Sequence, residues 1–331
     1  YRDSDGWAQI SRWENEWLRQ IILTERWEAG CNVIFATLNA VPHILMRGPA
    51  AGGEASFSLY RLKAGADREK NATVEREKIW SEPWQYDPSY SLTPLEIGEQ
   101  LNLVSYRASD GDIQLWRRNP GGGKDVIGYG WGPGYVLMPF KVNGEPYFVA
   151  YSQKSGSAEI YHWAADGRRE TVRSETWQPG CRLASFELED SDKTLRSYLL
   201  MYGPKGTFKE GKTEYNSKLY VWSKEMIRSD VLLFNRMEDS TVTPFRRGGV
   251  PHMMINKPGE AAFEIYFWTI SPPSKLKMEL LGKGTMPDNL KSNTTIPFEM
   301  NKALYFVSYD PRSDSATSGM AVLCTGTISG T

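Results

Sequence analysis

The chain has 331 residues, a formal net charge of −1, 24% charged residues and 40% hydrophobic residues. A net charge this small gives no overall field that would attract nucleic acid or an acidic membrane surface. No apolar run approaches the roughly 20 residues that a membrane-spanning helix needs, so we expect no membrane span. The 12 tryptophans suit sheet packing or ligand stacking, and three cysteines predict no disulfide framework.

Three sets of residues recur in the same order along the chain and predict a repeated unit. The first set pairs an apolar residue with an aromatic residue three positions later: Ile10 and Trp13, Phe57 and Tyr60, Ile113 and Trp116, Ile160 and Trp163, Leu219 and Trp222, Ile265 and Trp268. The second set lies at Phe35, Leu95, Phe140, Phe186, Phe245 and Phe298, and the third at Arg47, Tyr106, Tyr151, Tyr202, Asn256 and Tyr309. Intervals of about 46 to 59 residues are the size of one four-stranded propeller blade.

The stretch 139–181 shows this unit most clearly. Turn signals at Asn143-Gly144, Ser155-Gly156 and Asp166-Gly167 separate four runs of strand-forming residues. Asn-Gly and Asp-Gly favour tight hairpins because both turn positions need positive φ. The stretch therefore predicts a four-stranded antiparallel meander.

We predict an all-β chain, a six-bladed β-propeller of four-stranded antiparallel blades in a single domain over residues 1–331. The expected blades are residues 32–79, 91–129, 135–177, 181–235, 241–283, and 296–309 joined with 7–27. The last blade is shared by strands from the N- and C-terminal parts of the chain, which removes the exposed sheet edges. Residues 316–331 have no place in this scheme.

The repeat motif resembles the units of lectin-like and tectonin-like β-propellers. It combines Pro-Phe, Asn-Gly and Ser-Gly turns and the Ile-x-x-Trp pair, as in residues 139–167. The chain as a whole is also similar to the fungal hetero-Diels–Alderases of tropolone–sesquiterpenoid biosynthesis. The first resemblance implies sugar binding and the second implies a pericyclic reaction, and neither assigns a catalytic residue, because propellers serve unrelated functions.

The topology of a propeller predicts where a ligand would bind. With the strands of each blade named a to d from the axis outwards, the d–a and b–c loops share one face around the axial mouth. The first residues of the inner strands form an expected ring of Cys31, Tyr90, Tyr135, Cys181, Ser240 and Asn293. Just outside it lie Trp27, Trp84, Trp131 and Trp177, which either line an aromatic pocket or cap the outer strands.

Each b–c loop is expected to carry a basic residue. These are Arg47, Arg107, Lys154, Lys205, Lys257 and Arg312. They are either ordinary solvated side chains or a cationic rim that attracts an anionic or phenolate ligand. Cys31 and Cys181 would begin blades on opposite sides of the axis, too far apart for a disulfide. His43 and His252 share one repeat position, which favours a structural role.

Recognisable catalytic and metal motifs are missing from the sequence. There is no HExxH, no Cys/His cluster, no calcium loop and no Gly-x-Ser-x-Gly, so we expect neither a metal nor a cofactor. Asp110-Gly-Asp112 is interpreted as a turn. A pair of distant carboxylates acting on a glycoside stays open.

Two functions fit these observations best. A multivalent lectin would repeat its ligand contacts in each blade, whereas the loop residues here differ between blades. A single-site small-molecule enzyme fits that divergence, and cyclisation or cycloaddition relies mainly on positioning and hydrogen bonds. We expect Tyr90, Tyr135 and Arg47 to donate hydrogen bonds to a hydrophobic or phenolic substrate. A glycan ligand and a protein-binding scaffold stay as alternatives.

The chain is expected to enter the secretory pathway, with a signal peptide already removed. The triplets that begin at Asn71 and Asn293 match the acceptor pattern for N-glycosylation.

Overall fold

A computed structural model gives the fold of the chain. It describes residues 7–15, 18–26, 31–38, 41–49, 55–64, 74–83, 89–97, 100–118, 124–164, 166, 168–189, 194–235, 237, 240–257, 262–271, 275–285, 294–300 and 303–309. These residues contain strands and turns and no helix, and therefore no helix that could cross a membrane.

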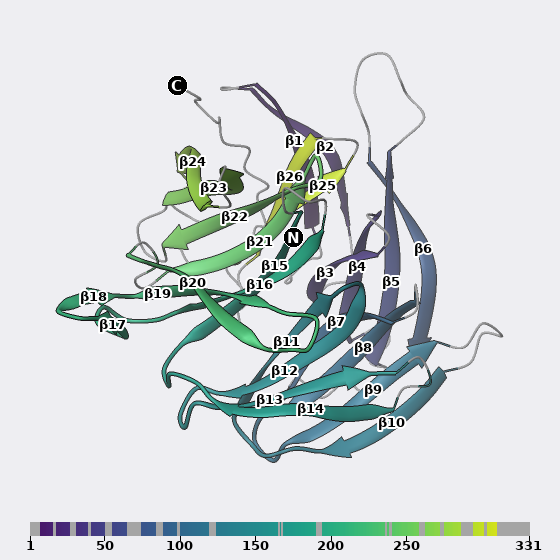
Figure 1. Ribbon diagram of the computed structural model, residues 1–331. Coiled ribbons are helices and arrows are strands. Elements are labelled where there is room, and N and C mark those ends of the chain that lie inside the picture. The colour runs from purple at the N-terminus through teal and green to yellow at the C-terminus, as the bar shows by residue number, and fades with distance from the viewer. Residues whose placement is uncertain are drawn as a thin grey trace. The chain divides into compact units, whose positions relative to one another are not determined.

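Five of the four-stranded antiparallel sheets use consecutive segments of the chain (Figure 1). The first comprises β3 (Asn32–Leu38), β4 (Val41–Pro49), β5 (Ala55–Ala64) and β6 (Val74–Pro83), and the second β7 (Tyr90–Ile97), β8 (Gln100–Arg107), β9 (Asp112–Arg118) and β10 (Lys124–Gly130). The third comprises β11 (Tyr135–Val142), β12 (Glu145–Ser152), β13 (Ser157–Trp163) and β14 (Arg169–Thr176). The fourth comprises β15 (Arg182–Glu189), β16 (Leu195–Tyr202), β19 (Ser217–Trp222) and β20 (Arg228–Phe234), and the fifth β21 (Thr241–Arg247), β22 (Val250–Lys257), β23 (Ala262–Ser271) and β24 (Lys275–Thr285).

A further sheet combines strands from the two ends of the described chain. Its order is β2 (Leu18–Arg26), β1 (Trp7–Asn15), β26 (Ala303–Tyr309) and β25 (Thr294–Met300). The pairing of Arg12 with Tyr305 joins β1 to β26. The predicted fold class is confirmed: the chain is all-β, with four-stranded antiparallel sheets arranged as a β-propeller.

The structure adds one element that the repeat did not predict. Between β16 and β19 the chain forms a two-stranded hairpin, β17 (Phe208–Glu210) and β18 (Thr213–Tyr215). Phe208 is buried in a hydrophobic cluster shared by the third and fourth blades, whereas the hairpin tip at Gly211 and Lys212 is exposed.

The chain divides into two compact units. One comprises Tyr1–Tyr86, Ser240–Phe267 and Met278–Thr331, and the other Asp87–Asp239 and Trp268–Lys277. In the first unit β25 packs beside β21, and in the second β11 packs beside β7 and β15. Neighbouring blades of a unit therefore meet through their first strands, as inner strands should. The prediction of a single domain stays a prediction.

The paired aromatic residues of the first repeat set mark the third strand of each blade. In four blades a β-bulge between the third and fourth strands falls at the same register position, after Ile10, Leu59, Ile160 and Leu219. In the blade β3–β6 the pairing with the second strand makes Leu59 the equivalent of Ile160, two residues beyond the predicted repeat member Phe57. A bulge bends and twists the strand locally, so its recurrence gives the outer parts of these blades the same shape.

Trp131 packs against the blade that follows it. Its ring stacks on Tyr161 and Phe148, with ring centroids 5.1 and 5.7 Å apart. The guanidinium of Arg169 lies 4.9 Å from the Trp131 ring centroid and 4.4 Å from that of Tyr161. Stacked aromatic pairs and a cation over the ring each stabilise this contact by about 0.5–1.5 kcal/mol.

Trp177 repeats this arrangement one blade later. Its ring lies 5.8 Å from Tyr151 of the preceding strands and 6.3 Å from Trp222 of the next blade. Arg228 covers the Trp177 ring at 4.6 Å. The indole Nε1 donates to Glu175 at 2.7 Å, so the buried N–H of Trp177 has a partner.

A tyrosine of the third repeat set fixes the loop between β10 and β11. The Tyr106 hydroxyl donates to the Gly132 carbonyl at 2.9 Å and accepts from the Tyr135 N–H at 2.9 Å. The N–H of Trp131 donates to the Gly111 carbonyl at 3.0 Å. The loop that ends this blade is therefore held against the loop between its second and third strands.

Tyr151 makes the same contacts in the next blade. Its hydroxyl donates to the Gln178 carbonyl at 2.5 Å and accepts from the Cys181 N–H at 3.2 Å. The Trp177 N–H donates to the Gly156 carbonyl at 2.7 Å. In these two blades the d–a and b–c loops lie at one end, as the topology predicted.

Gly156 cannot be replaced without disturbing this contact. Its φ is +77°, and a Cβ atom there would lie 2.1 Å from the Trp177 carbonyl oxygen. We expect Gly156→Ala to lower the free energy of unfolding by about 3 kcal/mol or more, through clash and backbone strain together. Urea unfolding measures this loss.

The matched control is Gly144→Ala in the same blade. Gly144 has φ +82° but no atom within 4 Å of its Cβ position, so only the left-handed backbone is penalised, by about 1–2 kcal/mol. Equal losses for the two variants would show that the loop contact contributes nothing.

Candidate functional site

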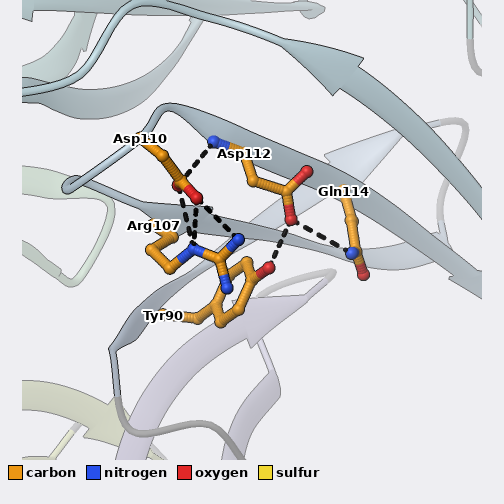
Figure 2. Close-up of polar contacts among 5 residues, drawn as sticks. All are labelled: Tyr90, Arg107, Asp110, Asp112 and Gln114. Atoms are coloured by element: carbon orange, nitrogen blue, oxygen red, sulfur yellow. Dashed lines mark hydrogen bonds and ion pairs between the residues drawn. The ribbon is translucent and has the colours of Figure 1, made fainter.

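A polar cluster at a predicted ligand-binding position lies at one end of the blade β7–β10 (Figure 2). The Tyr90 hydroxyl donates a short hydrogen bond to Asp112 Oδ2, and Gln114 Nε2 donates to the same oxygen at 3.3 Å. Arg107 lies over the Tyr90 ring, 4.7 Å from its centroid. Its Nε donates to both oxygens of Asp110 at 2.9 Å.

The backbone explains why these residues meet. Tyr90 and Arg107 are directly paired across β7 and β8, at the end of the sheet where Asp112 begins β9. Gly111, with φ +83°, turns the chain so that the Asp112 N–H donates to Asp110 Oδ1 at 3.2 Å. Asp110-Gly-Asp112 is thus the predicted turn, and it also supplies two carboxylates.

The cluster raises the pKa of Tyr90, which is a neutral phenol near neutral pH. The hydrogen bond to Asp112 is the main cause that raises the pKa of Tyr90 to about 12. The hydrogen bonds from Arg107 lower the pKa of Asp110, and Asp110 in turn raises the pKa of Arg107. The group thus contains a neutral phenol, two carboxylates and one guanidinium, with one excess negative charge.

The combination of an aromatic hydroxyl, a cation and a carboxylate can be looked for at the equivalent positions of the other blades whose side chains are described. The equivalents of Tyr90, Arg107 and Asp112 are Tyr135, Ser152 and Ser157 in the third blade, Cys181, Gly203 and Asn216 in the fourth, and Ser240, Lys257 and Ala262 in the fifth. The second blade alone in this comparison joins an aromatic hydroxyl, a cation and a carboxylate.

Tyr135, the second predicted donor, begins the neighbouring inner strand of the same unit. Its backbone N–H binds Tyr106, and its half-buried ring lies against Gly132, where a Cβ atom would be 2.9 Å from Tyr135 Cε2. Arg47, the third predicted donor, belongs to the other unit. It lies inside β4 with 2% of its surface exposed, not in a loop at a cationic rim.

The two predicted tryptophans that the structure describes have packing partners. Trp177 is 3% exposed, which leaves little of its ring for a substrate. Trp131 is half-buried and stacks on the next blade. These positions favour the structural interpretation of both rings.

Cys181 is a buried free thiol, and burial raises its pKa to about 11. A thiol that stays protonated is a poor nucleophile, so its place in the predicted ring is structural. Cys31 and Ser240, which belong to the other unit, are also buried, with 5% and 1% exposed. Trp27, Trp84, Asn71 and Asn293 lie outside the described residues.

Sequence reasoning missed Asp112 and Gln114. Asp112 and Gln114 are two residues apart on β9, and residues two apart on a strand point to the same side of the sheet. This spacing was the signal for two neighbouring polar side chains near the predicted ligand-binding end of the blade. The interpretation of Asp110-Gly-Asp112 as a turn gave the Asp112 side chain no role.

The comparisons with known proteins support the fold. No protein-family model and no curated protein matches the chain. Among solved structures, the periplasmic gluconolactonase of Pseudomonas aeruginosa is 11% identical, with 97% of each chain covered and a TM-score of 0.51. A functionally unknown protein of Desulfotomaculum acetoxidans is 8% identical, with 96% of this chain and 82% of that chain covered and a TM-score of 0.48.

The GH43_1 enzyme of Xanthomonas citri is 12% identical, with 88% of this chain and 85% of that chain covered and a TM-score of 0.37. At such low identities the likeness concerns the fold alone. The gluconolactonase, whose TM-score is above 0.5, is a β-propeller, as predicted for this chain. The compared structures give no support to the lectin-like or the Diels–Alderase resemblance.

Asp112→Asn should lower the pKa of Tyr90 from about 12 towards the ordinary value of about 10, because the carboxylate no longer accepts the phenol hydrogen. The ionisation can be followed by NMR of ¹³C-labelled tyrosine, with Tyr90→Phe assigning the signal. Glu159→Gln, which alters the separate contact of Tyr161 with Glu159, should leave the Tyr90 pKa unchanged. A Tyr90 pKa unaffected by Asp112→Asn would contradict the contact.

His43 and His252 occupy equivalent buried positions, as their shared repeat position indicated. Each Nδ1 lies 2.9 Å from the carbonyl oxygen two residues earlier, in Val41 and Val250. Asn102 donates its Nδ2 to the Gln100 carbonyl at 2.9 Å in the same way. Since a carbonyl only accepts, Nδ1 carries the hydrogen in both histidines.

Burial lowers the pKa of His43 below its ordinary value of about 6.5. The unfolded chain then binds this proton more tightly, so the free energy of unfolding should fall as the pH drops below about 6.5 towards the folded pKa. His43→Asn, which can keep the bond to Val41, should flatten this dependence in urea unfolding at several pH values. An unchanged pH dependence would show that His43 does not contribute to it.

Proposed function

We propose that the chain is a single-site small-molecule enzyme that binds its substrate at the cluster of Tyr90, Arg107 and Asp112. The observation that carries this proposal is the asymmetry of the blades. A multivalent lectin must rebuild the same contacts in each site, whereas the equivalent positions in the third and fourth blades hold no cation and no carboxylate.

The chemistry of the cluster suits a reaction that is guided by positioning and hydrogen bonds. The Arg107 guanidinium supplies donors where negative charge develops, and fixed donors stabilise such charge more than water does. The Tyr90 phenol donates its one hydrogen to Asp112, so it orients that carboxylate and does not donate to the substrate as the sequence predicted. The Arg107 guanidinium is oriented in advance by the bidentate contact with Asp110. Little reorganisation is then needed during the reaction.

The reaction proposed here is a cyclisation or cycloaddition of an apolar, conjugated substrate, of the hetero-Diels–Alder type, in secondary metabolism. Tyr135 on the adjacent inner strand offers a half-buried aromatic ring for such a substrate. The support is the sequence resemblance together with the donors of the cluster. Entry into the secretory pathway belongs to the same proposal, and glycosidase treatment of the native protein tests it.

The test is turnover of hydroxylated, conjugated candidate substrates, followed by mass spectrometry. A cyclised product has the mass of its substrate, and a cycloadduct has the summed mass of two reactants. Asp112→Asn and Tyr90→Phe should each reduce kcat/KM by about 100-fold, the scale of losing one positioned proton-transfer or hydrogen-bonding group.

Tyr266→Phe is the matched control, because Tyr266 also donates to a carboxylate, Glu264, at 2.5 Å, but on an outer strand of another blade. It should keep full activity. A product heavier than its substrate by one water would show hydrolysis and contradict cyclisation. Binding of one sugar at several blades, with no turnover, would contradict the enzyme altogether.

A further inference from the structure

The two oxygens of Asp112 have different surroundings. Oδ2 accepts hydrogen bonds from Tyr90 and from Gln114. Oδ1 accepts none from the residues that the structure describes, and the side chain is half-buried. One oxygen is thus fixed in place by two donors, and the other can accept a hydrogen from a ligand (Figure 2).

Asp110 has no oxygen left to accept a hydrogen from a ligand in the same way. Arg107 binds both of its oxygens, and the Asp112 N–H binds Oδ1 as well. Asp110 is also the more exposed of the two, with 52% of its side chain accessible. The cluster therefore contains one carboxylate that holds the cation and one with an oxygen that has no partner among the described residues.

We propose that Asp112 is the proton acceptor for a hydroxyl group of the substrate, and that Tyr90 is a positioning residue that orients the carboxylate. This rests on the proposed function, since it assigns roles within the same site. Gln114 assists Tyr90 on the same oxygen.

The step is a proton transfer. The substrate O–H bond breaks, its proton moves to Asp112 Oδ1, and its electron pair stays on the substrate oxygen. Asp112 becomes neutral, the substrate becomes an enolate or phenolate, and the total charge is unchanged. When the new ring has formed, Asp112 returns the proton to the product.

This role defines the class of substrate. A carboxylate is a weak base, so it removes a proton only from an acidic hydroxyl. An enol or phenol conjugated with a carbonyl group meets this requirement, whereas a simple sugar hydroxyl does not. Arg107 supplies the positive charge that favours the resulting oxyanion.

4-Nitrophenol is a suitable probe, because its phenol and phenolate forms absorb at different wavelengths. The dye is titrated with the whole protein at the pH where half of the free dye is ionised. A carboxylate is a weaker base than 4-nitrophenolate, so in a complex that does not react Asp112 accepts a hydrogen bond from the neutral phenol, and the phenolate absorbance should fall. Asp112→Asn should weaken binding about tenfold, as expected when a hydrogen bond to a charged acceptor is lost.

Tyr90→Phe should keep the direction of the spectral change, with about threefold weaker binding and an unchanged unfolding temperature, because it removes one of the two donors that orient the carboxylate. Asp112→Glu retains the carboxylate and should keep the spectral change, so it replaces Asp112→Asn if that variant does not fold. Glu159→Gln is the control on the third blade and should bind as the wild type does.

A rise in phenolate absorbance would show that the dye binds as the free anion, with no hydroxyl hydrogen for Asp112 to accept, and would overturn the role of Asp112. Equal binding by wild type and Asp112→Asn, or no binding by either, would overturn it too. In each of these cases the turnover assay still decides whether the chain is an enzyme, so the two failures can be told apart.

Discussion

The hydroxyl of the tyrosine on the second strand organises the blades in which its contacts are described. In two successive blades this one oxygen donates to a carbonyl of the d–a loop and accepts from the first N–H of the next inner strand. In the same two blades a glycine of the b–c loop packs closely against the backbone of the d–a loop, and its carbonyl accepts a hydrogen bond from that loop. Together they set where one blade ends and the next begins, and the tryptophan between them packs onto the following blade.

This constraint separates the residues that build the fold from those that vary. Once the loops are fixed, the first residue of an inner strand and its neighbours across the sheet can differ from blade to blade without loss of the repeat. In the second blade those positions hold Tyr90, Arg107 and Asp112. The proposed site thus lies on a scaffold whose backbone hydrogen bonds do not depend on it, and a rigid scaffold keeps such a site oriented.

The sequence predicted the strands well because turn glycines and paired aromatic residues are local signals. The hairpin β17–β18 was not predicted, since the long interval between Ile160 and Leu219 indicates an insertion in this blade but not that the inserted residues pair. Tyr90 was predicted as a site residue from topology alone. Asp112 was not, because its role depends on the pairing of β8 with β9 around Gly111, which places it beside Tyr90. Arg47 was expected in a loop but lies buried inside β4, because the repeat pattern did not show how far this strand extends.

The central claim is that one blade carries the ligand site. A crystal structure of the complex with a conjugated, hydroxylated ligand tests it most directly. The account predicts one ligand per chain, with its hydroxyl oxygen within hydrogen-bonding distance of Asp112 Oδ1 and with Tyr90 still bound to Oδ2. Ligands at equivalent positions of several blades, or one ligand bound away from Tyr90 and Asp112, would contradict it.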